Sequence, residues 1–245
     1  MTDLDTFASV YLAPTTDRSI DQKLMAMVAD AVVARIDGQR ICELGIGDQV
    51  WTPRLIDRFP DVTSVDGSQL LLADMQRHVG ELPQGRRWTP RHSYFEEFTP
   101  DAPFDAVLAT YVLEHVDDAG VVLKRSFNWI RPGGRIHIVV PHALSLHRRL
   151  SVSMGLANSA AELGETDRRM GHKRVFTFPE MEQLVVEAGY RICHRQGLFC
   201  KPLPNSVLEH CNQQQLRGLF NLGCELPMEY AAVAYLIGER PAAFE

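Results

Sequence analysis

The chain has 245 residues, of which 45% are hydrophobic and 23% are charged, and its formal net charge is −6. This length suits one α/β domain with insertions or two small domains, and the composition is that of a globular protein with a full core. The acidic balance argues against a nucleic-acid groove as the main surface, because phosphate binding usually requires a basic excess. We therefore expect no nucleic-acid partner.

The sequence also indicates the cellular compartment in which the protein works. No run approaches the roughly 18 apolar residues of a membrane span. The first residues include Asp3 and Asp5 instead of a basic, apolar signal sequence. The cysteines are five in number and contain no Cys-x-x-Cys pair, so neither a disulfide framework nor a zinc site is expected. We expect a protein of the reducing cytoplasm with no membrane partner.

Helical and strand patterns alternate along most of the chain. Apolar residues recur at the spacing of one buried helix face in 20–36, and Gly38 is placed to end that helix. The chain then predicts strand 40–44, helix 52–59, strand 62–65, helix 69–79, strand 86–92, strand 104–109, helix 118–129 with Val121 towards the sheet, strand 135–140, helix 178–188, strand 190–196 and strand 231–237. This alternation predicts a Rossmann-like, mostly parallel, doubly wound sheet in a single domain.

The stretch that follows the first strand predicts a nucleoside-binding site. Gly45 and Gly47 form a Gly-x-Gly turn, where the absence of a Cβ lets the backbone turn sharply and lie against a ligand. Asp66 comes 19 residues after Gly47, at the end of the second strand, which is the spacing of a carboxylate that binds a ribose diol. Glu43, just before the first glycine, suits a ligand with a cationic group.

Four motifs in order resemble the class I S-adenosylmethionine-dependent methyltransferases. They are the acid-x-Gly-x-Gly turn Glu43–Gly47, the strand-ending acid Asp66, the stretch Phe104–Ala109 followed by Val112–Val116, and the turn Arg131–Arg135. Together they cover roughly residues 38 to 141. The resemblance implies S-adenosylmethionine as cofactor and a seven-stranded sheet whose last strand is antiparallel. Many members carry a third glycine where Gln49 stands, which implies a different fit of the turn to the methionine part of the cofactor.

The resemblance also assigns cofactor contacts residue by residue. We expect the cofactor to contact Glu43, Gly45, Gly47, Asp66, Gly67, Ser68, Tyr94 and Phe95. Ser68 is also a candidate N-cap for the helix that starts at Gln69. In the family an N-terminal segment often folds over the active site, which would place Tyr11 near the substrate. The other interpretation of this segment (the start of the helical stretch 1–37) is a tail without fixed structure.

The regular alternation stops between Pro141 and Phe178, and we expect residues 142–178 to form a cap over the carboxyl ends of the strands. This cap holds six basic residues against three acids in a chain that is acidic overall. The excess favours an anionic acceptor, since guanidinium groups match phosphate and carboxylate geometry. Expected substrate contacts are Tyr11, Tyr111, His147, Arg148, Arg149, His172 and Arg174. The alternative is that these arginines pair with Glu162, Glu165 and Asp167 or form a solvated face.

Two histidines are candidate general bases, because an imidazole titrates near neutrality and a hydroxyl acceptor must lose a proton. His115 follows strand 104–109 and His142 follows strand 135–140, both at the edge where open α/β sheets bind ligands. The alternative for His115 is a structural role in its loop. No metal site is expected, because the spacing of His142 and His147 fits neither face of a helix and no acid pairs with them.

The segment around His142 and His172 is similar to a branch of these methyltransferases found in sugar and natural-product pathways, where Asn usually stands in place of His142. We therefore expect methyl transfer to an oxygen or nitrogen of a small molecule.

Two other functions stay open. A nicotinamide-dependent oxidoreductase also uses a glycine turn and a strand-ending acid, but it predicts a glycine where Val50 stands. A binding protein that holds the cofactor without turnover is the second.

Overall fold

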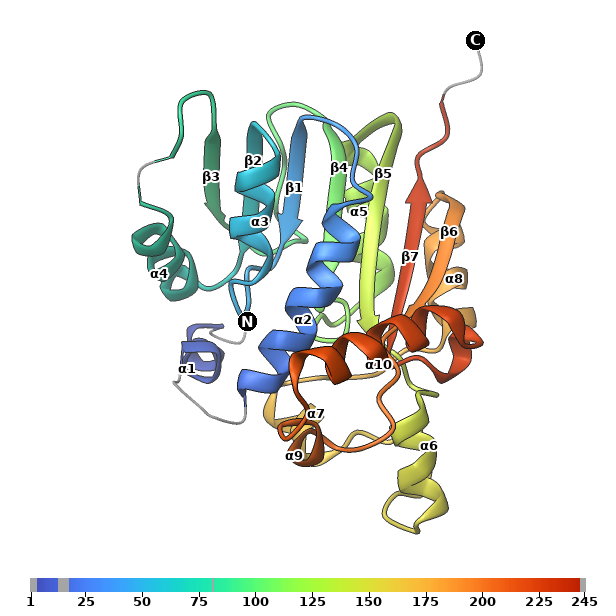
Figure 1. The fold of residues 1–245 in the computed structure, drawn as a ribbon. Coiled ribbons are helices and arrows are strands. Elements are labelled where there is room, and N and C mark those ends of the chain that lie inside the picture. The colour runs from blue at the N-terminus through green and yellow to red at the C-terminus, as the bar shows by residue number, and fades with distance from the viewer. Residues whose placement is uncertain (1–3, 13–17, 81, 243–245) are drawn as a thin grey trace.

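The computed structural model describes residues 4–12, 18–80 and 82–242. These residues form one seven-stranded sheet in the order β3-β2-β1-β4-β5-β7-β6 (Figure 1). The strands are β1 (Arg40–Leu44), β2 (Asp61–Asp66), β3 (Arg87–His92), β4 (Phe104–Thr110), β5 (Ile130–Pro141), β6 (Arg191–Leu198) and β7 (Val233–Glu239). The first five are parallel, and β7 runs antiparallel to both of its neighbours. The predicted fold class is confirmed.

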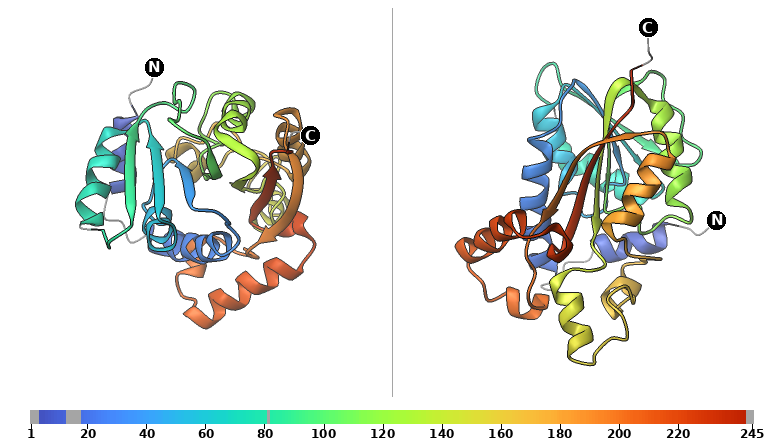
Figure 2. Two further views of the ribbon diagram at one scale, coloured as in Figure 1. Left: turned by 90° about the horizontal axis from the view of Figure 1, so that it is seen from above. Right: turned by 90° about the vertical axis from the view of Figure 1, so that its right-hand side faces the viewer.

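Helices cover both faces of the sheet (Figure 2). They are α1 (Asp5–Leu12), α2 (Arg18–Val33), α3 (Trp51–Arg58), α4 (Gln69–Val79), α5 (Ala119–Trp129), α6 (Leu146–Ser153), α7 (Glu165–Arg169), α8 (Phe178–Glu187), α9 (Asn205–Leu208), α10 (Gln213–Glu225) and the short 3₁₀ helix η1 (Met228–Tyr230). The core on one face includes side chains of α5 and α8, and the core on the other includes side chains of α2, α3 and α4. None of the helices in these described ranges is long and apolar enough to cross a membrane.

Local signals placed several elements correctly. Strand 40–44 and helix 69–79 have the expected bounds, and the Ser68 hydroxyl caps α4 by accepting a hydrogen bond from the Leu71 N–H at 3.2 Å. The first long helix ends at Val33, before the expected Ile36. Strand β5 begins at Ile130, five residues earlier than expected, because Ile130 pairs with Phe104 before a register shift.

The expectation that Val121 faces the sheet is wrong. Val121 is 41% exposed, because the buried stripe of α5 runs through Ala119, Val122 and Leu123 and leaves Val121 on the other side. Residues 156–163 in the cap form no helix. Leu156 is 72% exposed there, so the run has little apolar burial to offset the cost of starting a helix.

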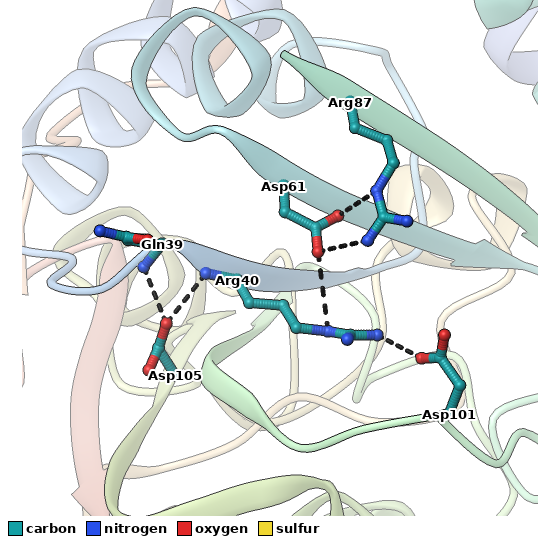
Figure 3. Close-up of polar contacts among 6 residues, drawn as sticks. All are labelled: Gln39, Arg40, Asp61, Arg87, Asp101 and Asp105. Carbon is teal, nitrogen blue, oxygen red and sulfur yellow. Dashed lines mark hydrogen bonds and ion pairs between the residues drawn. The ribbon is translucent and has the colours of Figure 1, made fainter. Parts of the chain in front are cut away.

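Charged side chains at the amino ends of the strands fasten the sheet (Figure 3). The Asp105 carboxylate accepts hydrogen bonds from the backbone N–H groups of Gln39 and Arg40, at 2.8 and 2.9 Å. Arg87 donates two hydrogen bonds to Asp61, at 3.1 and 2.7 Å, and joins the starts of β2 and β3. Because β1, β2 and β4 are parallel, this network lies at the opposite end from the glycine turn. Its role is structural.

Candidate active site

A cavity of about 950 Å³ lies at the carboxyl ends of the parallel strands, where open α/β sheets bind ligands. Its walls come from the glycine turn, the ends of β2 and β4, the loop after β5, the cap and the loop after β6. Figure 1 shows α1, α6, α7 and α9 gathered at this end of the sheet. The volume is at the upper end of the usual range for small-molecule sites, which leaves room for a cofactor and a small substrate.

The glycine turn has the backbone geometry that the sequence indicates. Gly45 and Gly47 have φ of +71° and +37°, in the left-handed region that favours glycine. A Cβ at Gly45 would lie 2.4 Å from Cγ1 of Val112, so no side chain fits there. Gln49 also has a positive φ, +59°, and its Nε2 donates a hydrogen bond to Asp74 at 2.8 Å. Its side chain is thus anchored to α4.

Asp66 lines the cavity at the end of β2, as predicted. Its Oδ2 accepts a hydrogen bond from the Ile46 N–H at 2.9 Å, and its Oδ1 accepts one from the Ser68 N–H at 2.7 Å. Burial raises the pKa of Asp66, while these two N–H groups act in the opposite direction. Each oxygen has lone-pair capacity left for a ribose hydroxyl.

Glu43 lies beneath the turn. Its side chain is fully buried and accepts hydrogen bonds from the hydroxyls of Thr52 and Ser64, at 2.8 and 2.5 Å. It is not among the described residues that line the cavity. Burial raises the pKa of Glu43 to about 7. The contacts support a positioning role, in which Glu43 fixes the start of α3 and the end of β1 behind the glycine turn.

The remaining expected cofactor contacts, Gly67, Ser68, Tyr94 and Phe95, all line the cavity. Helix α1 closes this part of the site. The ring of Tyr11 lies 3.7 Å from the position of a Cβ on Gly47, and the Ser68 hydroxyl donates to Asp5 at 2.6 Å. Of the two interpretations of the N-terminal segment, the described residues support the one that folds over the site.

The loop after β4 forms the floor of the other half of the cavity. Tyr111 has a positive φ, +54°, and its N–H donates to the Val139 carbonyl at 2.8 Å. Glu114 is fully buried, and neither of its carboxylate oxygens has a partner among the described residues. The rings of His115 and His172 meet edge to face with centroids 4.7 Å apart. Burial raises the pKa of Glu114 to about 7 and, with His172, lowers that of His115 to about 4.

His142 and His147 line the cavity from the segment after β5. The Nδ1 of His142 lies 3.2 Å from the Ala231 carbonyl, which places the proton on Nδ1 and leaves Nε2 as the acceptor. The ring packs against Phe178. Burial lowers the pKa of both histidines, that of His147 to about 3, so both are neutral at neutral pH.

The cap arginines have partners within the protein. Arg148 lines the cavity, but it pairs with Asp167 at 2.6 Å. Arg149 donates to the Leu144 carbonyl at 2.7 Å, and Arg174 donates to the Asp117 carbonyl at 2.7 Å. Arg149 and Arg174 are not among the described residues that line the cavity. For Arg148 the sequence left two interpretations, an anion contact or pairing with an acid of the cap, and the structure shows the second.

One cation of the site has no recognisable motif in the sequence. Lys201 lies in the connection after β6, lines the cavity and is partly buried. Within the described part of the chain its ammonium has no ion pair or hydrogen bond. Burial lowers the pKa of Lys201, although the negative charge of Asp21 acts to raise it. No local pattern could reveal Lys201, because only the return of the chain after β6 brings it to the cap.

Comparison with known proteins agrees with this geometry. Residues 16–195 match the family described as Methyltransferase domain. An uncharacterized methyltransferase of Mycobacterium tuberculosis is 32% identical over 134 residues, which are 53% of this chain and 66% of that protein. The chain thus spans slightly less than two thirds of that relative. The ubiquinone biosynthesis O-methyltransferase of Aeromonas salmonicida is 26% identical over 69% of each chain.

The N-methyltransferase NodS of Bradyrhizobium japonicum has a similar structure, with a TM-score of 0.64 over 98% of this chain and 100% of NodS. At 10% sequence identity this likeness shows the fold alone. The family match covers well over half of the chain and includes the glycine turn, Asp66, the loop after β4 and the cap. The chain therefore belongs to the methyltransferase domain family, with the class I fold of S-adenosylmethionine-dependent methyltransferases.

Proposed function

We propose that this chain transfers a methyl group from S-adenosylmethionine to an oxygen or nitrogen of a small, anionic metabolite. The observation that carries the proposal is that one cavity joins two different sets of groups. At one end are the glycine turn and Asp66, which suit a nucleoside. At the other are Lys201, His142 and the loop after β4, which suit a polar acceptor.

The reaction mainly requires the protein to align the acceptor with the methyl group of the cofactor. The methyl carbon of a sulfonium carries a good leaving group, so a nucleophile placed in line behind it completes the transfer. Asp66 and the glycine turn would hold the ribose and the amino-acid part of the cofactor. The start of α3 follows the turn, and its free backbone N–H groups favour a carboxylate there.

Lys201 is the reason for proposing that the acceptor is negatively charged. A partly buried ammonium without a protein partner is costly, and a phosphate or carboxylate on the acceptor would offset that cost. Arg149 and Arg174, expected from sequence to serve this role, donate to backbone carbonyls and are not among the described residues that line the cavity. We therefore assign the anion to Lys201, with Arg148 held by Asp167 as its neighbour in the cavity.

Proton removal, where the acceptor is a hydroxyl, is assigned to His142. The Ala231 carbonyl fixes its proton on Nδ1, and its lowered pKa keeps Nε2 unprotonated at neutral pH. His115, the other predicted base, packs against His172 at the floor of the cavity. The relatives leave both acceptor atoms open, since one is named an O-methyltransferase and the similar structure an N-methyltransferase.

The test is a screen of purified protein with S-adenosylmethionine against acceptors grouped by charge, with release of S-adenosylhomocysteine as the readout. Turnover with hydroxyl or amine compounds that bear a carboxylate or phosphate, and none with their methyl esters or dephosphorylated forms, is the expected result. Cofactor binding without turnover on any acceptor would favour a binding protein. Tighter binding of a nicotinamide dinucleotide than of S-adenosylmethionine would contradict the assignment as a methyltransferase.

A further inference from the structure

We propose that Glu114, His115 and His172 form a binding site for a divalent transition-metal ion at the floor of the cavity. One ligand atom from each of these side chains lies within 4.8 Å of the other two. All three residues line the cavity, and a set of three protein ligands leaves a coordination position for a further ligand. No local pattern in the sequence indicates this site, because His172 stands far along the chain from the Glu114-His115 pair.

Glu114 provides the main reason to expect an ion. Its side chain is fully buried, and both carboxylate oxygens lack a hydrogen-bond donor within the described residues. Burying an unpaired carboxylate is among the most costly arrangements in a protein interior. A cation bound by this carboxylate would satisfy the oxygens that the protein leaves without partners.

The histidines are held as metal-ligating histidines usually are. Asp167 lies 3.0 Å from Nδ1 of His172, so that Nδ1 donates its proton to the carboxylate and Nε2 keeps its lone pair for a metal. Asp167 is itself fixed by Arg148 at 2.6 Å and by the Gly164 N–H at 2.8 Å. The carbonyl of Gly171 lies beside the ring of His115 and can orient it in the same way.

Backbone contacts hold the two segments of the site together. The Lys173 N–H donates to the Glu114 carbonyl at 2.8 Å, which ties the cap to the loop after β4. The two imidazole centroids are 4.7 Å apart. With metal–nitrogen bonds of about 2.0–2.1 Å, two imidazoles on one ion have centroids about 4.5 Å apart at a right angle and about 5.2 Å apart at the tetrahedral angle. Ligand atoms of a closed tetrahedral site lie about 3.4 Å apart, so binding would draw the three side chains inward.

The ligand set selects the class of metal. Two imidazole nitrogens and one carboxylate suit Zn²⁺, Co²⁺, Mn²⁺ or Fe²⁺, whereas Mg²⁺ and Ca²⁺ prefer sites made of oxygen. Three protein ligands leave a position for water or for an acceptor oxygen, as in catalytic zinc sites. An ion there would hold the acceptor and lower the pKa of its hydroxyl. This last role rests on the proposed function, but metal binding itself does not.

Metal binding can be measured without acceptor or cofactor. Tag-free protein is stripped with a chelator and titrated with Co²⁺, whose visible absorption reports coordination by nitrogen, and Zn²⁺ is then added as competitor. We expect one Co²⁺ per chain. Glu114→Gln, His115→Ala and His172→Ala should each weaken binding at least tenfold. Asp167→Asn should weaken it about 10- to 100-fold, because Asp167 acts through His172.

His210→Ala is the matched control, because His210 is exposed in the connection between α9 and α10. It should bind Co²⁺ like the wild type. Thermal melts of each variant separate loss of ligand from loss of fold, and added Zn²⁺ should raise the melting temperature of the wild type and of His210→Ala alone. The proposed site is wrong if the wild type shows no Co²⁺ spectrum. It is also wrong if Glu114→Gln and His172→Ala bind Co²⁺ as tightly as the wild type does. A metal-free protein that methylates amines, and loses that activity in Glu114→Gln, would show that Glu114 binds a cationic acceptor instead.

Discussion

The Oδ2 atom of Asp66 accepts a hydrogen bond from the backbone N–H of Ile46 at 2.9 Å, so the acid that ends β2 is locked to the glycine turn that follows β1. Ile46 stands between Gly45 and Gly47, and the Ser68 N–H holds the other carboxylate oxygen at 2.7 Å. The Asp66 carboxylate, the proposed ribose ligand, is thus fixed by backbone groups before any cofactor arrives. Preorganisation of this kind lowers the entropy cost of binding.

Asp66→Ala should weaken S-adenosylmethionine binding by about 1–3 kcal/mol, the cost of losing hydrogen bonds to a charged group. Calorimetry on the purified variant measures this. Asp57→Ala, which removes an exposed acid from α3, is the control and should bind as the wild type does. An unchanged affinity of Asp66→Ala would remove Asp66 from the cofactor site.

Lys201→Met should raise the acceptor KM about 10- to 100-fold and leave cofactor affinity unchanged, because it removes the charge but keeps most of the packing. The salt dependence of kcat/KM should also become flatter. Lys124→Met, on the exposed side of α5, is the matched control. If Arg149→Ala or Arg174→Ala raises KM instead, and Lys201→Met does not, the anion binds at the cap arginines.

His142→Ala should lower kcat about 10²- to 10⁴-fold on a hydroxyl acceptor, with little change in cofactor affinity. The pKa of His142 lies below its usual value because of burial, so the acid limb of the wild-type kcat profile should fall below pH 6.5. His78→Ala removes an exposed histidine of α4 and should leave the profile unchanged. A loss of less than fivefold in His142→Ala would mean that alignment alone carries the transfer.

Glu43 predicts a pH dependence of stability. Its pKa is raised from 4.5 to about 7 in the folded protein, so folding favours the protonated form. Its contribution is fully present below pH 4.5 and is lost as the pH rises towards 7, because the unfolded chain gives up this proton first. The slope is at most about 1.4 kcal/mol per pH unit.

Glu43→Gln keeps the size and the hydrogen-bonding oxygen but cannot ionise. Urea denaturation of the cofactor-free protein between pH 4.5 and 8 should show the wild type losing stability relative to this variant as the pH rises. Parallel stability curves for the two proteins would show that Glu43 is not perturbed by burial.

The sequence by itself determined the sheet and the positions of the glycine turn and Asp66 at its carboxyl edge. Those features are local: apolar strand runs, caps such as Ser68 before α4, and glycines where the backbone turns each carry their own pattern. Asp66 was predictable because its distance along the chain from Gly47 reflects one βαβ unit. The role of Glu43 was less visible, because a buried acid with two hydroxyl partners has the same sequence pattern as one that meets a ligand.

The tertiary structure alone decided which residues meet at the proposed acceptor end. Lys201, Glu114 and His172 lie on three separate connections, and no spacing links them until the cap folds back across the ends of β4 and β5. The same folding placed Asp167 between Arg148 and His172, and so removed Arg148 from the apparent basic surface into an internal ion pair. A charge count records which charges a segment carries, whereas the fold decides which of them meet each other and which remain for a ligand.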